Sequence, residues 1–385
     1  MKQPVYLNHA ATSNHKFKAT VNELCQYLVA NNNLNTNRSS QNINELELIF
    51  ETRQSLAKFF NAPDPAHIIF TANATMSLNM ILNGLLKSGD HVLTTAVEHN
   101  AVARPLYLLE TENNLSVTHL FCEADGQLDP RQIESMIRPE TKVMVMTHAS
   151  NVLGTILPVK ECFKIAKSHG ILTVLDSAQT AGFLPIDMEA MSIDVLAFTG
   201  HKSLMGISGI GGFALGENVE NLLDPWLSGG TGSASLSFRQ PDCLPDKFEP
   251  GTLNILGILS LKSSLQEIQN IGLKTIAMHE RTLTERFLTG LQGLPIRILG
   301  GKNAINSVPV VSVTAPNIDS GELAQLLFDR YQIITRSGLH CSPLAHQTAG
   351  TVQSGAVRFS FGWQTTTEEI DYTLAALKYI LLENR

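Results

Sequence analysis

A lysine and an aspartate in this chain have the types and surroundings that cofactor chemistry requires. Lys202 lies in a glycine-rich stretch, AFTGHKSLMGISGIGGF, and Asp176 ends an earlier apolar run, ILTVLDS. A lysine amine can form a Schiff base with an aldehyde, and a carboxylate can keep a ring nitrogen protonated. Pyridoxal phosphate chemistry depends on these two protein groups, so the pair indicates a site for that cofactor.

A second group of residues is suited to a phosphate. In HIIFTANATMSLNMILNGLL an apolar strand precedes a helix that is expected to begin near Thr75. Free N–H groups and the helix dipole at such a start attract anions, so we expect a backbone contact at Ala74 and a hydroxyl contact from Thr75. Thr199 and His201, close to the lysine, are further candidate phosphate donors. Each signal alone is weak, because small polar residues before a helix are often simple caps.

Two more side chains complete the predicted cofactor site. Gln179 follows Asp176 closely, where it can reach a phenolic oxygen on the ring. His99 follows another apolar run, and its imidazole can lie flat against the ring. An isolated histidine after a strand more commonly has a structural role. The lysine, the aspartate and the anion-binding helix start together favour the cofactor site.

These residues meet only if the elements that carry them form one parallel sheet. Short apolar runs rich in Val, Leu, Ile and Thr are typical of buried strands, and residues 157–170 between two of them have helical spacing. The repeated pattern predicts an α/β protein with a large, doubly wound, mostly parallel sheet. Ligands of such sheets bind beyond the carboxyl ends of the strands, where Asp176, Asn151 and Thr199 would lie. The expected strands are HVLTTAV, KVMVMTH, ILTVLDS and DVLAFTG.

The length of 385 residues favours two domains. Helical periodicity continues from about 254 to 294, and short strands return afterwards in IRILG and PVVSVTA. We therefore predict a large cofactor-binding domain over residues 15–260. Residues 1–14 and 261–385 would form a smaller α+β domain, with a long connecting helix at about 273–294.

The composition excludes several other classes of protein. The formal net charge is −7, so the chain lacks the basic excess that nucleic acids attract, and no nucleic acid is expected as a partner. We find neither a signal peptide nor an apolar run long enough to span a membrane, which predicts a cytoplasmic protein without a membrane partner. Five scattered cysteines without a CxxC pair predict neither a disulfide framework nor a metal site.

Taken together, these motifs resemble fold-type I pyridoxal phosphate enzymes of the class V aminotransferase superfamily, in particular its cysteine desulfurase and selenocysteine lyase branch. The resemblance covers nearly the whole chain, and it implies that Lys202 forms the Schiff base and that His99 stacks on the ring. FEPGTLN resembles the segment that reaches the phosphate of the neighbouring subunit, which implies roles for Gly251 and Thr252 and a homodimer with shared active sites. The other matching segments are VYLNHAATS, EHNAVARP, THASNVLGT, LDSAQ and TGHKSLMGISGIGG.

The same resemblance assigns residues to the substrate. ITRSGLHCSP resembles the group II desulfurase motif, in which a cysteine on a short loop takes up sulfur, and that cysteine is Cys341. VRFSFGWQTTTEEID resembles the segment with the substrate-carboxylate arginine, here Arg358, whose planar fork matches a carboxylate. Asn151 is expected to assist it, and Arg38 in TNRSSQ stands where relatives have another active-site arginine. Leu339 stands where relatives often have a histidine, which indicates a divergent subgroup.

The resemblance implies a cysteine desulfurase that converts L-cysteine to L-alanine. Lys202 would remove the Cα proton, and the Cys341 thiolate would attack the substrate sulfur to form a persulfide. His340 or His99 would lower the pKa of the thiol or move protons. Group II relatives commonly pass sulfur to an acceptor protein, so such a partner is expected. The alternatives are a selenocysteine lyase, an aminotransferase or C–S lyase that does not use Cys341, and a scaffold or sulfur carrier without cofactor.

Overall fold

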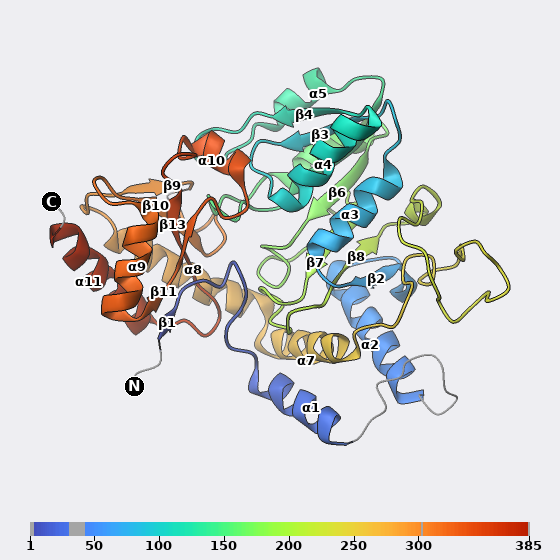
Figure 1. Ribbon diagram of the computed structural model, residues 1–385, viewed down its shortest axis with the longest axis horizontal. Coiled ribbons are helices and arrows are strands. Elements are labelled where there is room, and N and C mark those ends of the chain that lie inside the picture. The colour runs from blue at the N-terminus through green and yellow to red at the C-terminus, as the bar shows by residue number, and fades with distance from the viewer. Residues whose placement is uncertain (1–3, 31–42, 302, 384–385) are drawn as a thin grey trace.

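The computed structural model describes residues 4–30, 43–301 and 303–383, and its largest element is a seven-stranded sheet (Figure 1). The strand order is β2, β8, β7, β6, β5, β3, β4. Strand β8 is antiparallel to both neighbours, and the other neighbouring pairs are parallel, which confirms the mostly parallel sheet. The strands are β2 (Ile68–Thr71), β3 (His91–Thr95), β4 (Ser116–Leu120), β5 (Thr141–Thr147), β6 (Leu172–Asp176), β7 (Val195–Thr199) and β8 (Gly211–Leu215).

Side chains alternate along the buried strands, so the sheet has two apolar faces. Val174 points into the core that contains α3 (Ala74–Leu85) and α4 (Asn100–Asn113), whereas its neighbour Leu175 points into the opposite core. Helices therefore cover both faces, which explains why the strands are almost wholly apolar. The second core includes α2 (Ile43–Phe60), α6 (Val159–Ser168) and α7 (Ile255–Ile271), and α1 (Lys18–Val29) packs on α7.

A smaller antiparallel sheet, in the order β12, β13, β10, β9, lies beside the large one (Figure 1). The N-terminal segment joins this region, because β1 pairs with β11 and Asn8 bridges Ser360. The four-stranded sheet consists of β9 (Arg297–Leu299), β10 (Val310–Thr314), β12 (Arg336–Gly338) and β13 (Ala356–Ser360), and β1 (Val5–Tyr6) and β11 (Ile333–Ile334) form a separate parallel pair. The helices that follow β10 in the chain are α9 (Ser320–Tyr331), α10 (Pro343–Ala349) and α11 (Thr367–Glu383). The short α5 (Ile133–Met136) belongs to the large-sheet region.

The helical region predicted from 254 to 294 consists of two helices. Helix α7 ends at Ile271 and α8 (Leu273–Gly290) follows, with Gly272 between them at a φ of 90° that side chains rarely adopt. Helix α8 contributes Ile276 to the core under the large sheet and Phe287 to the core of the small one. The proposed domain limits stay a prediction. Within the described residues, no helix has both the length and the apolar character needed to cross a bilayer.

Candidate active site

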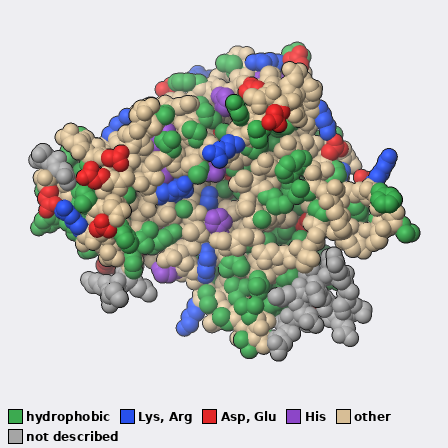
Figure 2. Space-filling view, in the orientation of Figure 1, with side chains coloured by type: hydrophobic (Ala, Val, Ile, Leu, Met, Phe, Trp, Pro, Cys, Tyr) green, Lys and Arg blue, Asp and Glu red, His purple; other side chains and the backbone are tan. Residues whose placement is uncertain are grey.

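Two adjoining hollows open at the carboxyl ends of the parallel strands. The inner hollow measures about 70 Å³ and the outer one about 440 Å³. Figure 2 shows Lys, Arg and His side chains gathered near the centre of one face, while acidic side chains lie mostly toward its margins. Arg358 and Lys202 line the outer hollow. The structure brings together in the inner hollow the residues Ala74, Thr75, His99, Asn151, Asp176, Gln179, Thr199, His201 and Lys202.

Lys202 and Asp176 come together because their strands are neighbours. Strands β6 and β7 pair in parallel with Asp176 opposite Ala197, and Lys202 follows the end of β7. The turn that carries the lysine is tight. The N–H of Gly200 donates to the carbonyl of Ile210 at 2.9 Å, and a Cβ on Gly200 would lie 2.7 Å from Ile210 Cγ2. A glycine is therefore needed for the chain to turn back over the strand end.

Burial shifts the pKa values of both groups. It lowers the pKa of Lys202 to about 8; the charge of Asp176 opposes this change, and those of Arg358 and Arg336 add to it. Burial also raises the pKa of Asp176, whose carboxylate accepts the N–H of Ala178 at 2.9 Å. A lower pKa leaves more uncharged amine near neutral pH, which makes Lys202 a better nucleophile toward an aldehyde.

His99 is a neutral imidazole held by a helix start. Its Nδ1 accepts the N–H of Ala101 at 3.0 Å at the N-terminus of α4, so the ring proton lies on Nε2. Burial lowers the pKa of His99 to about 3, and the positive charges of Lys202 and Arg336 contribute. The ring is thus fixed beside the lysine with Nε2–H available as a donor.

The predicted anion site is the N-terminus of α3. Asn73 caps this helix with its side chain, and Ala74 and Thr75, its first residues, line the inner hollow. The buried hydroxyl of Thr199 has no hydrogen-bond partner among the described residues, and His201 lines the same hollow. An unpartnered buried hydroxyl beside a helix N-terminus is suited to a phosphate. The donor set therefore fits pyridoxal phosphate, with an amine for its aldehyde and a carboxylate for its ring nitrogen.

Two arginines form an anion site on the small sheet. Arg358 on β13 lies opposite Arg336 on β12, and both line the outer hollow. The buried Arg358 donates to the carbonyl of Asn151 at 3.1 Å and to Asn8 Oδ1 at 3.0 Å, which are neutral acceptors. Burial and then Arg336 lower the pKa of Arg358 to about 9. No ion pair joins either arginine to a carboxylate within the described residues, so both are available to a substrate carboxylate.

Cys341 lies at the exposed apex of the loop between β12 and α10, and Arg336 Nη2 donates to its Sγ at 3.2 Å. His340 does not act on this thiol as expected. Its Nδ1 lies 3.2 Å from His346 Nε2, and its Nε2 donates to the carbonyl of Arg336 at 3.1 Å. The charge beside the sulfur belongs to Arg336, which the sequence analysis missed although it stands in the same motif as Cys341.

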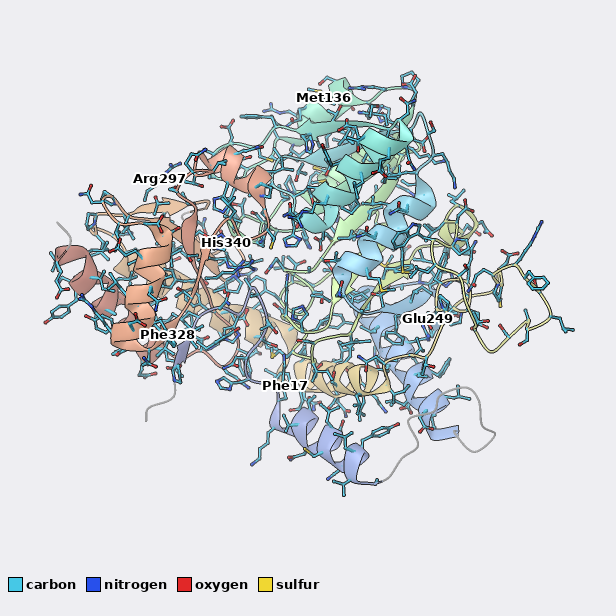
Figure 3. The ribbon with its side chains drawn as sticks, in the orientation of Figure 1. Phe17, Met136, Glu249, Arg297, Phe328 and His340 are labelled. Atoms are coloured by element: carbon cyan, nitrogen blue, oxygen red, sulfur yellow. The ribbon has the colours of Figure 1, made fainter. Side chains whose placement is uncertain are left out.

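The amide of Asn151 is committed to the same loop. Its Nδ2 donates to the carbonyl of His340 at 2.8 Å, and its Oδ1 accepts the hydroxyl of Ser342 at 2.6 Å. Figure 3 shows His340 between the large and the small sheet. Asn151 thus fastens the cysteine loop to the large sheet, and its carbonyl, not its amide, contacts Arg358.

Two of the predicted cofactor residues lie apart from the hollows. Gly251 and Thr252 are exposed and line neither hollow, so their role toward a neighbouring subunit stays a prediction. Arg38 lies outside the described residues, and its predicted role stays a prediction as well.

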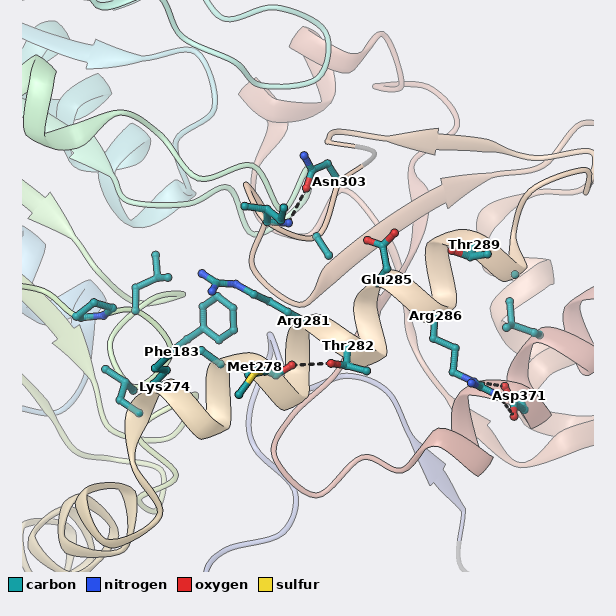
Figure 4. A pocket seen from close by; sticks show the side chains of 18 residues that line it. Phe183, Lys274, Met278, Arg281, Thr282, Glu285, Arg286, Thr289, Asn303 and Asp371 are labelled. Atoms are coloured by element: carbon teal, nitrogen blue, oxygen red, sulfur yellow. Dashed lines mark hydrogen bonds and ion pairs between the residues drawn. The ribbon is translucent and has the colours of Figure 1, made fainter.

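A larger hollow lies elsewhere on the molecule. It measures about 1570 Å³ and follows the exposed side of α8 (Figure 4). Arg281 lies over the ring of Phe183 at 5.5 Å, and Arg286 pairs with Asp371 at 2.6 Å. None of the predicted catalytic or cofactor residues lines it, so size does not identify the active site here.

A lysine after one parallel strand, a buried aspartate at the end of its neighbour and a helix N-terminus around one cavity define the fold-type I class of pyridoxal phosphate enzymes. Within this class, the aminotransferase class-V family model matches residues 5–373, and the chain belongs to that family.

Individual relatives agree with this assignment. The chain is 33% identical over 337 residues to a protein of Pyrococcus abyssi named "Probable cysteine desulfurase", covering 86% of this chain and 82% of that one. It is 32% identical to a protein of the same name from Borreliella burgdorferi, covering 99% of this chain and 93% of that one. The apo structure of a cysteine desulfurase from Thermococcus onnurineus NA1 superposes with a TM-score of 0.90 at 30% identity, covering 99% of this chain and 95% of that one. The predicted family is confirmed.

Proposed function

We propose that this protein is a pyridoxal phosphate-dependent cysteine desulfurase that converts L-cysteine to L-alanine and receives the sulfur on Cys341. One observation carries the proposal. Arg336 lines the cavity that holds Lys202, and the same guanidinium holds Cys341 Sγ at 3.2 Å. Cys341 lies far from the cofactor residues in the sequence, and this contact links its thiol to their site. The names of the relatives support the same activity.

The residues of the inner hollow would hold the cofactor. Lys202 would bind its aldehyde, and Asp176 would hold its ring nitrogen protonated. His99 and Gln179 would contact the ring, and the N-terminus of α3 with Thr199 would receive the phosphate. Bound there, the cofactor supplies an electron sink for the charge that develops on the substrate Cα.

The protein groups then have distinct tasks. Arg358 and Arg336 bind the substrate carboxylate, and the Lys202 amine takes the Cα proton. The Cys341 thiolate attacks the substrate sulfur, so an S–S bond forms as the C–S bond breaks. The electron pair of the broken bond stays with the carbon fragment, which gains protons and leaves as alanine. His99, neutral with a proton on Nε2, is placed to move protons beside Lys202.

Product analysis with L-cysteine and a reductant tests this proposal. We expect equal amounts of alanine and sulfide from the wild type and from Cys25→Ala, which alters another exposed cysteine, and loss of both from Cys341→Ala. Pyruvate, or alanine formation that does not need Cys341, would instead indicate a lyase or an aminotransferase. Turnover of L-selenocysteine alone would indicate a selenocysteine lyase, and a purified protein that binds no cofactor would contradict the proposal altogether.

The proposal includes a homodimer with shared sites. Leu236 and Phe238 are fully exposed on a long connection after β8, at 101% and 108%, and a second copy that covered them would bury this apolar surface. Gly251 and Thr252 follow that connection and are exposed. Light scattering of the purified protein tests the dimer, and a monomer would contradict it.

The proposal also includes a sulfur-acceptor protein and a cytoplasmic location. Cys341 is exposed at the loop apex, so a persulfide there is accessible to another protein's thiol. A thiol that must return to its reduced form after each turnover is suited to a reducing compartment. Addition of an acceptor should raise the rate of alanine formation without changing its ratio to sulfur released.

A further inference from the structure

The loop that carries Cys341 has an unusual backbone. His340 and Cys341 are consecutive and have φ values of 52° and 58°, in the left-handed region that side chains rarely adopt. Such a conformation persists only where surrounding contacts determine it. The contacts that hold this loop therefore decide where the sulfur lies.

A chain of three hydrogen bonds runs under the loop. Thr351 Oγ1 lies 2.8 Å from His346 Nδ1, His346 Nε2 lies 3.2 Å from His340 Nδ1, and His340 Nε2 lies 3.1 Å from the carbonyl of Arg336. The two imidazoles are buried, nearly parallel at 17°, and 5.5 Å apart between centroids. The chain ends on the residue whose guanidinium contacts Cys341 Sγ.

The proton positions in this chain follow from its last acceptor. The carbonyl of Arg336 only accepts, so His340 Nε2 carries a proton and its Nδ1 accepts from His346 Nε2–H. His346 Nδ1 then accepts the hydroxyl of Thr351. Both rings are neutral in this arrangement. Burial lowers the pKa of His340 to about 3, with Arg358 and Arg336 contributing, and burial also lowers the pKa of His346.

We propose that His346 is a positioning residue for the sulfur-transfer step. By donating Nε2–H to His340, it holds that ring against the carbonyl of Arg336, and so fixes both the left-handed loop and the arginine beside the thiol. His346 itself touches neither the cofactor hollow nor the outer one. This inference rests on the proposed use of Cys341 in desulfuration.

Other hydrogen bonds of the loop hold it to the large-sheet region and do not orient the imidazole of His340. Asn151 binds the carbonyl of His340 and the hydroxyl of Ser342, and Asn100 N–H donates to the carbonyl of Cys341 at 2.8 Å. These bonds join the loop to the large sheet. The imidazole of His340 joins it to the backbone carbonyl of Arg336, beside the contact of the Arg336 guanidinium with Cys341 Sγ, and among the described residues His346 is the side chain that orients this imidazole.

Three substitutions of His346 separate positioning from mere packing. In His346→Gln the amide nitrogen stands near the place of imidazole Nε2, so the donor to His340 is kept. His346→Asn reaches only as far as Nδ1, and His346→Leu has no donor. We expect His346→Gln to keep near-wild-type alanine formation, and His346→Asn and His346→Leu to lose about tenfold to a hundredfold, as expected for a reacting group displaced by about 1 Å.

Two readouts make this a test of the loop. Exchange of the substrate Cα proton with deuterated solvent depends on Lys202 and should be retained in all three variants. Alkylation of Cys341 by iodoacetamide, followed by mass spectrometry, should change in rate in His346→Asn and His346→Leu but not in His346→Gln. If His346→Asn does not fold, Thr351→Val, which removes only the outermost hydroxyl, must shift the alkylation rate in the same direction.

The outcomes are distinct. Equal alanine and alkylation rates in all variants, or a His346→Gln variant as impaired as His346→Asn, would overturn the positioning role. If the wild type forms no alanine, the proposed desulfuration fails. The dependence of Cys341 alkylation on the residue at 346 then still decides whether His346 positions the loop.

Discussion

The buried amine of Lys202 should capture pyridoxal phosphate in a strongly pH-dependent way. Burial lowers the pKa of Lys202 to about 8 from an ordinary value of 10.5, and only the uncharged amine attacks an aldehyde. About a tenth of this amine is uncharged at pH 7 and about nine-tenths at pH 9. For an ordinary lysine, the uncharged fraction at pH 7 is roughly 0.0003. The rate constant of capture should therefore rise about tenfold between pH 7 and pH 9.

Stopped-flow mixing of cofactor-free protein with pyridoxal phosphate measures this rate through the visible absorbance of the lysine-bound cofactor. Lys202→Ala is the control for surface lysines. His99 and His201, with pKa values of about 3 and about 4, do not titrate in this range. A rate constant that is flat from pH 7 to pH 9, or that rises only near pH 10, would refute the reasoning.

The same pKa difference predicts an effect on stability. The folded-state pKa of Lys202 lies below its unfolded value, so the unfolded protein binds more protons between about pH 8 and 10.5, and the stability of the cofactor-free protein rises with pH there. Below pH 8 the full penalty acts, about 3 kcal/mol. In urea unfolding at pH 7, cofactor-free Lys202→Met should be more stable than the wild type by up to this amount, and the gain should vanish above pH 10.5.

Three further predictions concern other buried groups. Arg358→Lys keeps the charge but loses the planar fork, so the KM for L-cysteine should rise about 10- to 100-fold in steady-state kinetics; an unchanged KM would contradict the carboxylate site. Thr199→Val should weaken binding of pyridoxal phosphate about tenfold in equilibrium titrations, because one hydrogen bond to a charged group is lost. It should leave binding of pyridoxal, which lacks the phosphate, unchanged. Burial raises the pKa of Glu280 to about 8 from 4.5, so this carboxyl costs stability increasingly as the pH rises from 4.5 to 8. Glu280→Gln should therefore gain up to about 4 kcal/mol over the wild type between pH 5 and pH 8 in urea unfolding, and a constant difference would argue against a buried carboxyl.

Much of the large sheet could be predicted from local pattern. Apolar runs of strand length gave β3, β5, β6 and β7, and helical spacing placed α6 close to its observed bounds. Strand β8 was missed, because its glycines resemble a turn. A Cβ on Gly211 of this strand would lie 2.8 Å from Asn73 Cα, so the glycine that weakens the strand signal lets α3 begin close to the sheet.

The active site also has a part that could be predicted from local sequence and a part that could not. Residue types and neighbours alone were enough to place Asp176 at the end of one strand and Lys202 just after another, because a strand's end and the polar residues there are adjacent in sequence. Parallel pairing of β6 and β7 then brought them to one cavity. The partners of Cys341 had no such local signal. His340 or His99 was expected to act on the thiol, yet the ring of His340, next to a left-handed backbone, contacts His346 and the carbonyl of Arg336.

The sequence by itself determined which segments are buried strands and helices, and which lysine and aspartate stand at their ends, because these properties depend on residues a few positions apart. Only the tertiary structure decided that Arg336 lies opposite Arg358 and beside Cys341, and that His346 supports the cysteine loop. The physical reason is that strand register and loop conformation are set by contacts between residues far apart in the chain, and such contacts leave no periodic trace in the sequence.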